Sequence, residues 1–132
     1  MARYVETDNQ INFATWFAYQ YPKYINNLCS SMAGINLGPI AGKRAKQMGY
    51  RKGWPDIQLA ISNTFYNGLF IEFKIFENNK KSTLTAEQKE VHVSLRDAGY
   101  RVAVCYSSME AQEEVKEYLR YVVQKPLQPI SD

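Results

Sequence analysis

The sequence predicts one α/β domain in which helices pack on a small mixed sheet. Two apolar, strand-like runs, residues 56–61 and 69–76, lie on either side of the turn-forming pair Asn67-Gly68 and predict an antiparallel hairpin. A helical pattern over residues 86–98 separates this hairpin from a third apolar run, residues 101–106. A helix between two strands favours a parallel crossover, so we expect the third strand to run parallel to the second.

Helices are expected at both ends of this core. Residues 7–21 have aromatic side chains at helical spacing, with Thr7 and Gln10 in capping-box positions and Pro22 closing the helix. Residues 30–42 are rich in Ser, Gly and Pro and predict a loop, and a short basic helix over residues 43–48 follows, ended by Gly49. Residues 77–83 predict a polar loop, and Ser107 opens a last helix that runs to about residue 122.

Length and composition indicate a single domain and exclude several kinds of site. The chain has 132 residues and is 45% hydrophobic, which is enough for one packed core over residues 1–124. Residues 125–132, with two prolines, are expected to form an extended tail. Cys29 and Cys105 are too few for a disulfide framework or a four-thiolate zinc site, and a lone histidine, His92, excludes a histidine-rich metal site.

The N-terminal sequence lacks the cationic and apolar segments of a signal peptide. No run approaches the roughly 18 apolar residues that a membrane span requires. We therefore expect a soluble, unprocessed protein of the reducing cytoplasm, without a membrane partner.

Positive charge is concentrated in one segment, although the net charge is only +3. Five basic residues occur without an intervening acid: Lys43, Arg44, Lys46, Arg51 and Lys52. Such a patch suits a polyanion such as nucleic acid, because contacts to phosphates supply much of the affinity for DNA. A solvated surface helix is the alternative interpretation, and charge alone does not exclude it.

The strand over residues 69–76 carries charges where a buried strand should have none. Side chains alternate across a strand, so Ile71, Phe73 and Ile75 are expected on one face, and Glu72 and Lys74 on the other. Burying either charge without a partner costs several kcal/mol. A nearby charged group, such as a bound cation, would make this arrangement tolerable.

Asp56 begins the preceding strand, and the hairpin could bring its carboxylate close to Glu72. Two carboxylates and a lysine are the groups required for Mg²⁺-assisted phosphodiester hydrolysis, because hard oxygens hold the ion and lysine can orient water or offset charge. A solvent-facing Glu72-Lys74 pair on an exposed sheet face is the competing interpretation, since such short motifs are common by chance.

Four segments in order strengthen the first interpretation: GWPDIQL, YNGLFIEFK, LTAEQ and GYRVAVCY. Their order resembles the VRR-NUC domain of the PD-(D/E)xK nuclease superfamily, over roughly residues 49–120. The resemblance implies a restriction-endonuclease-like fold, a mixed sheet flanked by helices with an αβββαβ-type core. It also suggests a standalone, phage-type member, which would act in the host cytoplasm.

The resemblance also implies roles for particular residues. Asp56 and Glu72 would be metal ligands together with the backbone carbonyl of Phe73, and the metal would be Mg²⁺ or Mn²⁺. Lys74 would position or activate the attacking water. Gln88 matches a glutamine that lies at the site in the family.

Three of these residues have competing explanations. Gln88 stands three residues after Thr85 and could simply complete a capping box. Glu6 is the candidate for a glutamate that family members place on the first helix, and Asp8 competes for that role. His92 follows Gln88 by four residues, but a lone histidine is expected at the surface rather than in catalysis.

The function implied by the resemblance is metal-dependent cleavage of DNA, in particular of branched DNA by a homodimer similar to Holliday junction resolvases. With this function, the segment from Lys43 to Lys52 is expected to contact DNA, and Lys80 and Lys81 contribute or are merely solvated. The alternatives are a flap or nicking nuclease, a DNA-binding module without catalysis, and a small-molecule or protein-binding α/β domain with accidental motifs.

Overall fold

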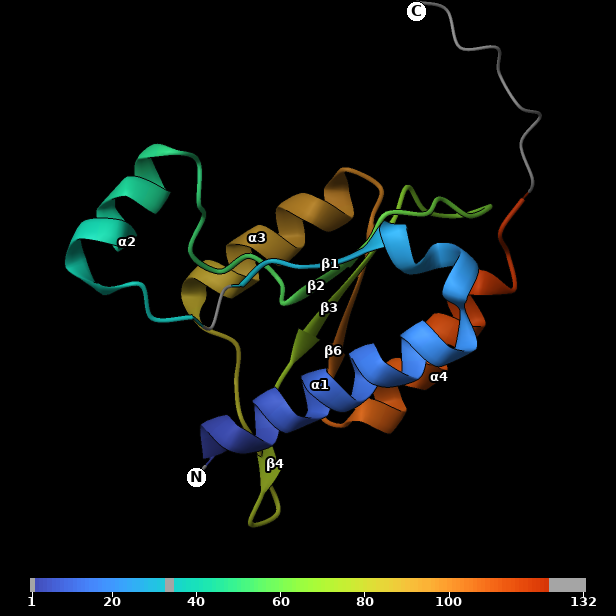
Figure 1. Cartoon of the computed structure of the whole chain (residues 1–132), viewed down its shortest axis with the longest axis horizontal. Coiled ribbons are helices and arrows are strands. Elements are labelled where there is room, and N and C mark those ends of the chain that lie inside the picture. Colours follow the sequence, from blue (N-terminus) through green and yellow to red (C-terminus); the bar gives the residue numbers. More distant parts are fainter. Residues whose placement is uncertain (1, 33–34, 124–132) are drawn as a thin grey trace, which may run out of the picture.

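The centre of the molecule is a four-stranded mixed sheet with helices on both faces (Figure 1). The computed structural model of the chain describes residues 2–32 and 35–123, with the side chains of residues 2–5 left out. The first three strands are antiparallel and the fourth is parallel to the third. In sheet order the strands are β1 (Leu28–Ser30), β2 (Ile57–Leu59), β3 (Leu69–Phe73) and β6 (Arg101–Cys105). The predicted α/β class, hairpin and parallel crossover are confirmed.

Three helices cover the sheet, two on one face and one on the other (Figure 1). The larger core lies between the sheet and helices α1 (Ala2–Gln20) and α4 (Ser108–Leu119), where Phe13, Phe17 and Val115 are fully buried. Helix α3 (Ala86–Asp97) packs on the opposite face through Val91 and Leu95 against Phe70 and Val102. Each such side chain contributes about 1.5–3 kcal/mol on burial. Both faces of β3 are therefore buried.

Helix α1 begins earlier than the sequence suggested. It starts at Ala2, so Thr7 and Gln10 lie within the helix, and the predicted capping box at Thr7 is wrong. Residues 2–6 contain no Gly or Pro to end the helix before Thr7. The other end agrees with the prediction, because Pro22 begins a separate 3₁₀ helix, η1 (Pro22–Asn27).

The basic helix α2 (Gly38–Gln47) also begins five residues before the predicted start at Lys43. Pro39 occupies its first turn, where a missing N–H costs nothing and a fixed φ favours the helix. Gly49, with a φ of +108°, follows its C-terminus as predicted. None of the α2 side chains, all of which the structure describes, is buried, and the helix stands apart from the body of the domain (Figure 1).

Strand β3 is shorter than predicted, and the segment after it is not a plain loop. The strand ends at Phe73, and a small hairpin follows, formed by β4 (Phe76–Glu77) and β5 (Lys80–Lys81). Asn78 and Asn79 have φ values of 53° and 60°, as a type I′ turn requires. The predictions of a strand through residue 76 and a polar loop over residues 77–83 were therefore wrong.

The remaining boundaries follow local capping. Thr85 and Gln88 form the predicted capping box at α3, and the Ser107 hydroxyl accepts a hydrogen bond from the Glu110 N–H at α4. Helix α4 ends at Leu119, and strand β1 was not predicted. The predicted tail, residues 125–132, lies outside the described residues. In the part of the chain that is described, no helix combines the length and apolar character needed to cross a membrane.

The loop before β2 packs directly on the backbone of α3. Gly53 has a φ of +90°, and a Cβ atom added there would lie 2.6 Å from the carbonyl carbon of Glu87 and 2.7 Å from its oxygen. Only glycine fits both the conformation and the space. This contact fixes the loop that leads into β2 against the first turn of α3.

We therefore expect Gly53→Ala to lower the free energy of unfolding by about 2–4 kcal/mol, through strain at positive φ and overpacking. Urea unfolding followed by circular dichroism measures this. Gly42→Ala is the matched control, because a Cβ atom there meets nothing within 4 Å. The control should leave stability unchanged or raise it by up to about 1 kcal/mol. A Gly53→Ala protein as stable as the wild type would contradict the packing described.

Candidate active site

The register of the β2–β3 hairpin brings Asp56 to Glu72. Ile57 pairs with Ile71 in this antiparallel ladder, so the next position outward sets Asp56 opposite Glu72. The Asp56 Oδ2 atom accepts a hydrogen bond from the backbone N–H of Phe73 at 2.8 Å. The charge of Glu72 also acts on the Asp56 carboxyl group and raises its pKa. The hairpin thus creates a close pair of carboxyl groups at the end of β3.

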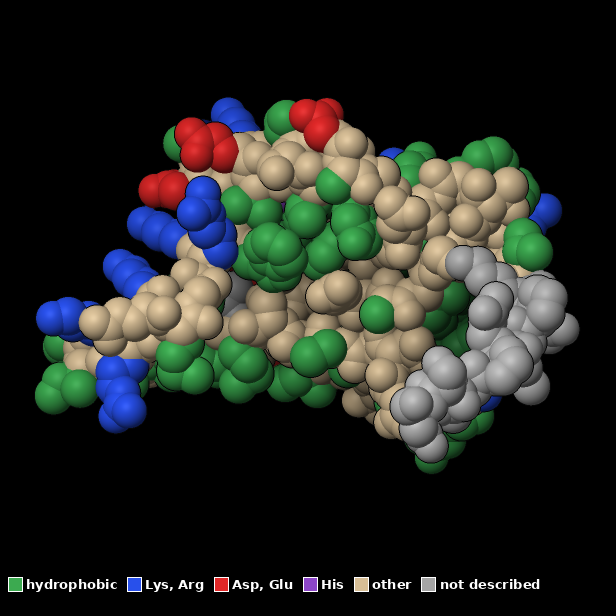
Figure 2. Space-filling view, turned by 90° about the horizontal axis from the view of Figure 1, so that it is seen from above, with side chains coloured by type: hydrophobic (Ala, Val, Ile, Leu, Met, Phe, Trp, Pro, Cys, Tyr) green, Lys and Arg blue, Asp and Glu red, His purple; other side chains and the backbone are tan. Residues whose placement is uncertain are grey.

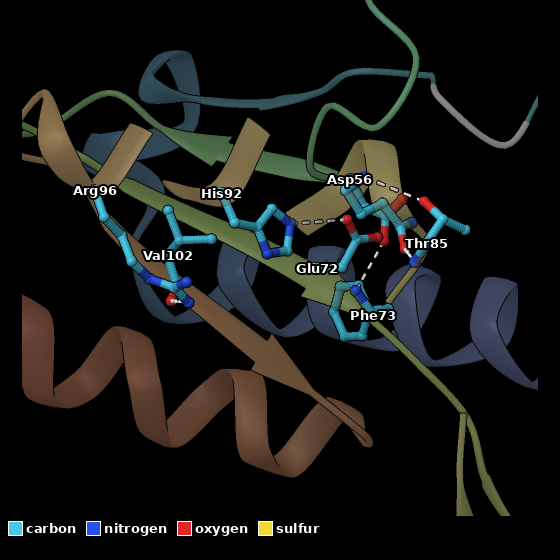
Figure 3. Close-up of polar contacts among 8 residues, drawn as sticks. Asp56, Glu72, Phe73, Thr85, His92, Arg96 and Val102 are labelled. Atoms are coloured by element: carbon cyan, nitrogen blue, oxygen red, sulfur yellow. Dashed lines mark hydrogen bonds and ion pairs between the residues drawn. The ribbon is translucent and has the colours of Figure 1, made fainter. Parts of the chain in front are cut away.

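Glu72 is buried beneath α3, where it meets His92. Its exposed fraction is 2%, and that of His92 is 0%. The His92 Nε2 atom lies 3.3 Å from the Glu72 Oε1 atom (Figure 3). The expectation that His92 is a surface residue was therefore wrong. It lies three residues before Leu95 on the helix face that packs on the sheet, and this spacing was visible in the sequence.

Burial dominates the acid–base properties of the carboxyl pair. Burial first, and then the adjacent Glu72, raise the pKa of Asp56, while the N–H of Phe73 and the charge of Lys74 lower it, and the resulting pKa is about 7. Burial likewise raises the pKa of Glu72. Two carboxyl groups with raised pKa values form a site in which positive charge would favour their ionised forms.

Lys74 supplies part of that charge. It follows β3 directly, is half-buried, and its backbone N–H donates to the Cys105 carbonyl at 2.9 Å. Its positive charge lowers the pKa of Glu6, Asp56 and Glu72, so the ammonium group acts on all three carboxyl groups.

Glu6 lies near the carboxyl pair, on α1. Burial raises its pKa first, and the charge of Asp56 raises it further. Because α1 begins at Ala2, Glu6 stands inside the helix rather than before it. Asp8 is exposed, and two residues of helix turn a side chain by about 200°. Of the two candidates, Glu6 is the one whose charge interacts with the site.

Gln88 is engaged at the start of α3. Its side-chain Oε1 atom accepts a hydrogen bond from the backbone N–H of Thr85 at 2.9 Å. Its backbone N–H donates to the Thr85 hydroxyl at 3.1 Å. This capping box accounts for the residue type without catalysis. Since Gly53 packs on the backbone of Glu87 and Gln88, the same turn borders the loop that leads to Asp56. A catalytic role for Gln88 stays a prediction.

The surroundings of His92 keep its imidazole neutral. Burial lowers its pKa first, and the positive charges of Arg96 and Lys74 lower it further, against the opposing effect of Asp56. Arg96 is itself held by a hydrogen bond to the Val102 carbonyl at 3.0 Å (Figure 3). Among the described residues, no partner reaches the buried Nδ1 atom of His92.

The donor set at the end of β3 fits a hard divalent cation. Asp56 and Glu72 supply carboxylate oxygens, and a cation bound between them would favour their ionised forms against the burial that raises both pKa values. Within the described part of the chain, no three His, Cys, Asp or Glu side chains form a complete metal cluster. Two carboxylates with a backbone carbonyl suit Mg²⁺, which keeps several of its waters.

The basic residues predicted to contact DNA lie on three segments. Lys43, Arg44 and Lys46 are on α2, Arg51 and Lys52 are in the loop before β2, and Lys80 and Lys81 form β5. Lys and Arg side chains gather over the end of the molecule that carries α2 (Figure 2). In Figure 1 the end of β3 lies between α2 and the β4–β5 hairpin.

One cavity separates this basic region from α3. It has a volume of about 760 Å³, and its lining includes Lys46, Arg51 and Trp54. Lys52 forms an exposed ion pair with Glu87 across it at 3.6 Å. On the hairpin side, the Lys81 ammonium lies 5.0 Å from the centre of the Tyr106 ring. Apart from the Lys52 pair, the structure gives these basic residues no carboxylate partner among the described side chains.

Comparison with known proteins gives a structural match. No model of a known protein family matches the chain, and no curated protein matches its sequence. A solved structure described as a VRR_NUC domain protein superposes with a TM-score of 0.73 at 26% sequence identity. The match covers 89% of this chain and 90% of the other.

The raised pKa of Asp56 predicts that ionising it weakens the metal-free fold. The folded state binds the extra proton between about pH 4 and pH 7, so this group's contribution to stability falls as the pH rises through that range. Asn at this position stays neutral and can still accept the Phe73 N–H. We therefore expect Asp56→Asn to raise the free energy of unfolding by about 1–3 kcal/mol at pH 8 without divalent metal.

Urea unfolding in a chelating buffer at both ends of this pH range measures the effect. The gain should be small near pH 4, where Asp56 of the wild type is protonated in the folded state and about half protonated in the unfolded state. Asp8→Asn, an exposed carboxylate two residues from Glu6, is the control and should change stability by less than about 0.5 kcal/mol. An Asp56→Asn protein that is less stable than the wild type at pH 8 would contradict the prediction.

Proposed function

The chain carries a VRR-NUC domain, and we propose that it is a Mg²⁺- or Mn²⁺-dependent endonuclease that hydrolyses phosphodiester bonds in branched DNA. At the level of the family, the domain implies a nuclease-type function with DNA as substrate. The observation that supports catalysis in this chain is the Asp56–Glu72 pair, in which Glu72 is buried and Asp56 partly buried, with Lys74 beside it. A site of this kind costs stability and has no packing role.

Asp56, Glu72 and the carbonyl of Phe73 would hold the metal. A divalent ion bound there supplies a Lewis acid that polarises the phosphate and lowers the pKa of a bound water. Lys74 would orient the attacking water and offset negative charge that develops on the phosphate. Glu6 lies within electrostatic range of Asp56 and Lys74 and would hold a proton or a water at the edge of the site.

The basic segments would position the DNA. Phosphate contacts fix the register of a duplex on a protein without reading its sequence. α2 and the loop before β2 lead directly to Asp56, and β5 begins six residues after Lys74, so DNA bound along these segments would pass the end of β3.

The branched substrate and a homodimer belong together in this proposal. One domain offers one site, and symmetric cutting of a four-way junction requires two sites related by a twofold axis. A flap or nicking nuclease would use the same residues and differ in how the DNA is presented. A binding module without catalysis is less well supported, because it would have no use for the costly carboxyl pair.

We expect the protein to cut labelled DNA in Mg²⁺ or Mn²⁺ and not in EDTA, with four-way junctions preferred over flap, single-stranded and duplex DNA. Glu72→Gln removes a negative ligand and Lys74→Ala removes the ammonium group. Each should lower the single-turnover rate by at least about 100-fold with folding intact. Circular dichroism verifies the fold of both variants.

The substrates separate the alternatives. Preference for the flap, together with a monomeric mass by light scattering, would replace the resolvase proposal with a flap or nicking nuclease. Binding of DNA without any cleavage would favour the inactive module. Neither binding nor cleavage would mean that the nuclease proposal fails for this chain.

DNA affinity should depend on α2 without any effect on the fold. The variant Lys43→Ala/Arg44→Ala/Lys46→Ala should weaken binding and reduce the slope of log affinity against log salt by about 0.9 for each phosphate that the protein no longer neutralises. Its thermal stability should stay near that of the wild type, because no α2 side chain is buried. Fluorescence anisotropy over a salt series measures both the affinity and the slope.

A matched control removes the same number of charges elsewhere. Lys23 lies in η1, Lys116 in α4 and Arg120 just after it, on other elements than the basic segments. Their triple alanine variant should retain nearly all of the affinity. Equal losses of affinity in the two triple variants would show that net charge, and not α2, governs binding.

A further inference from the structure

The buried contact between His92 and Glu72 is not explained by the chemistry described so far. His92 is the sole histidine of the chain and is completely buried. Its Nε2 atom lies 3.3 Å from Glu72 Oε1, while its Nδ1 atom has no partner among the described residues. Figure 3 shows Glu72 between His92 on one side and Asp56 on the other.

Packing alone does not account for this histidine. The same face of α3 carries Val91 and Leu95, which fill the space against the sheet with apolar groups. An unpartnered ring nitrogen in that layer costs free energy that a leucine or phenylalanine would avoid. A histidine is therefore favoured here only if its Nε2 atom, which contacts Glu72, makes a polar interaction that an apolar side chain cannot make.

Which group donates this hydrogen bond follows from the chemistry of the imidazole and the carboxylate. A neutral imidazole has one N–H donor and one bare acceptor nitrogen, and an ionised carboxylate only accepts. A Glu72 that binds a cation is ionised, so Nε2 must carry the proton and donate it to Oε1. The bare nitrogen is then Nδ1, the atom that has no partner among the described residues.

We propose that His92 is a positioning residue that donates its Nε2–H to Glu72 Oε1 and fixes the Glu72 side chain for metal binding. This inference rests on the proposed metal-dependent function. The hydrogen bond from His92 would hold one oxygen of Glu72 from the α3 side. Glu72 would then keep a single rotamer, with its other lone pairs facing Asp56. Hydrogen bonds to ligating carboxylates from outside the metal shell typically change metal affinity by about 10- to 100-fold.

Two substitutions separate positioning from packing. His92→Gln can place an amide N–H where Nε2 lies, whereas His92→Leu fills the space without a donor. Mn²⁺ binding by calorimetry should weaken by about 10- to 100-fold in the Leu variant and stay near the wild-type value in the Gln variant. Thermal unfolding in EDTA reports the stability of each metal-free protein. It therefore shows whether a loss of Mn²⁺ affinity is due to misfolding.

The ring nitrogens give a readout that does not depend on mutation. Because the chain has one histidine, protein labelled with ¹⁵N-histidine shows only two ring nitrogen signals, which need no assignment to a residue. With saturating Mg²⁺ we expect the tautomer with Nε2 protonated and Nδ1 bare. The opposite tautomer in the metal-loaded protein would overturn the proposal.

The outcomes distinguish this inference from the function on which it rests. Wild-type protein that binds no Mn²⁺ overturns the metal-dependent function and the positioning role together. Wild-type binding that His92→Leu leaves unchanged overturns the positioning role alone. Equal losses of Mn²⁺ affinity in His92→Leu and His92→Gln would also overturn it, because the donor would then make no difference.

Discussion

The hydrogen bond from the Phe73 N–H to the Asp56 carboxylate is the constraint on which the site depends. It fixes the last position of the β2–β3 ladder, and that register determines which side chains meet. A slip of one residue in an antiparallel pair would turn Glu72 to the face of α1 and α4 and bring Phe73 under α3. Asp56 thus acts both as a candidate ligand and as the residue that aligns the other ligand.

The rest of the fold supports this alignment from both sides. Phe13 and Phe73 pack at a ring distance of 6.0 Å on the α1 side, while α3 covers Glu72 on the other. Burial on both faces makes the end of β3 rigid, and it also makes the carboxyl pair costly. Proteins accept such local costs where function requires a defined charge. Burial of the large apolar core around Phe17, Leu59 and Val115 offsets the free-energy cost of the carboxyl pair.

Local sequence patterns predicted those parts of the structure that local interactions determine. The Thr85–Gln88 capping box and the Ser107 cap were recognised because each depends on neighbouring residues, and the two apolar runs predicted the β2–β3 hairpin, although its connection is a long loop and not a tight turn at Asn67-Gly68. The hairpin then made the approach of Asp56 to Glu72 predictable. The Asn78-Asn79 turn was recognisable in the same way, but the strands that it joins have two residues each and show no alternation.

Other features depend on tertiary contacts that no local pattern contains. Strand β1 has three residues, and it is a strand because β2 offers it an unpaired edge. The burial of His92 follows from how closely α3 lies on β3, which its spacing to Leu95 suggests but does not prove. The position of Glu6 beside Asp56 required the true start of α1, which the apparent capping box at Thr7 concealed.

The exposed helix α2 divides the molecule into parts with different tolerance to sequence change. A substitution at β3 alters the core and the carboxyl pair at once, so most replacements there are costly. On α2, by contrast, no side chain is buried, and replacements affect only what the helix touches. Related chains could therefore diverge in this arm while the carboxyl pair stays the same. Under the proposed function, such changes would alter the contacts to DNA without any loss in the stability of the fold.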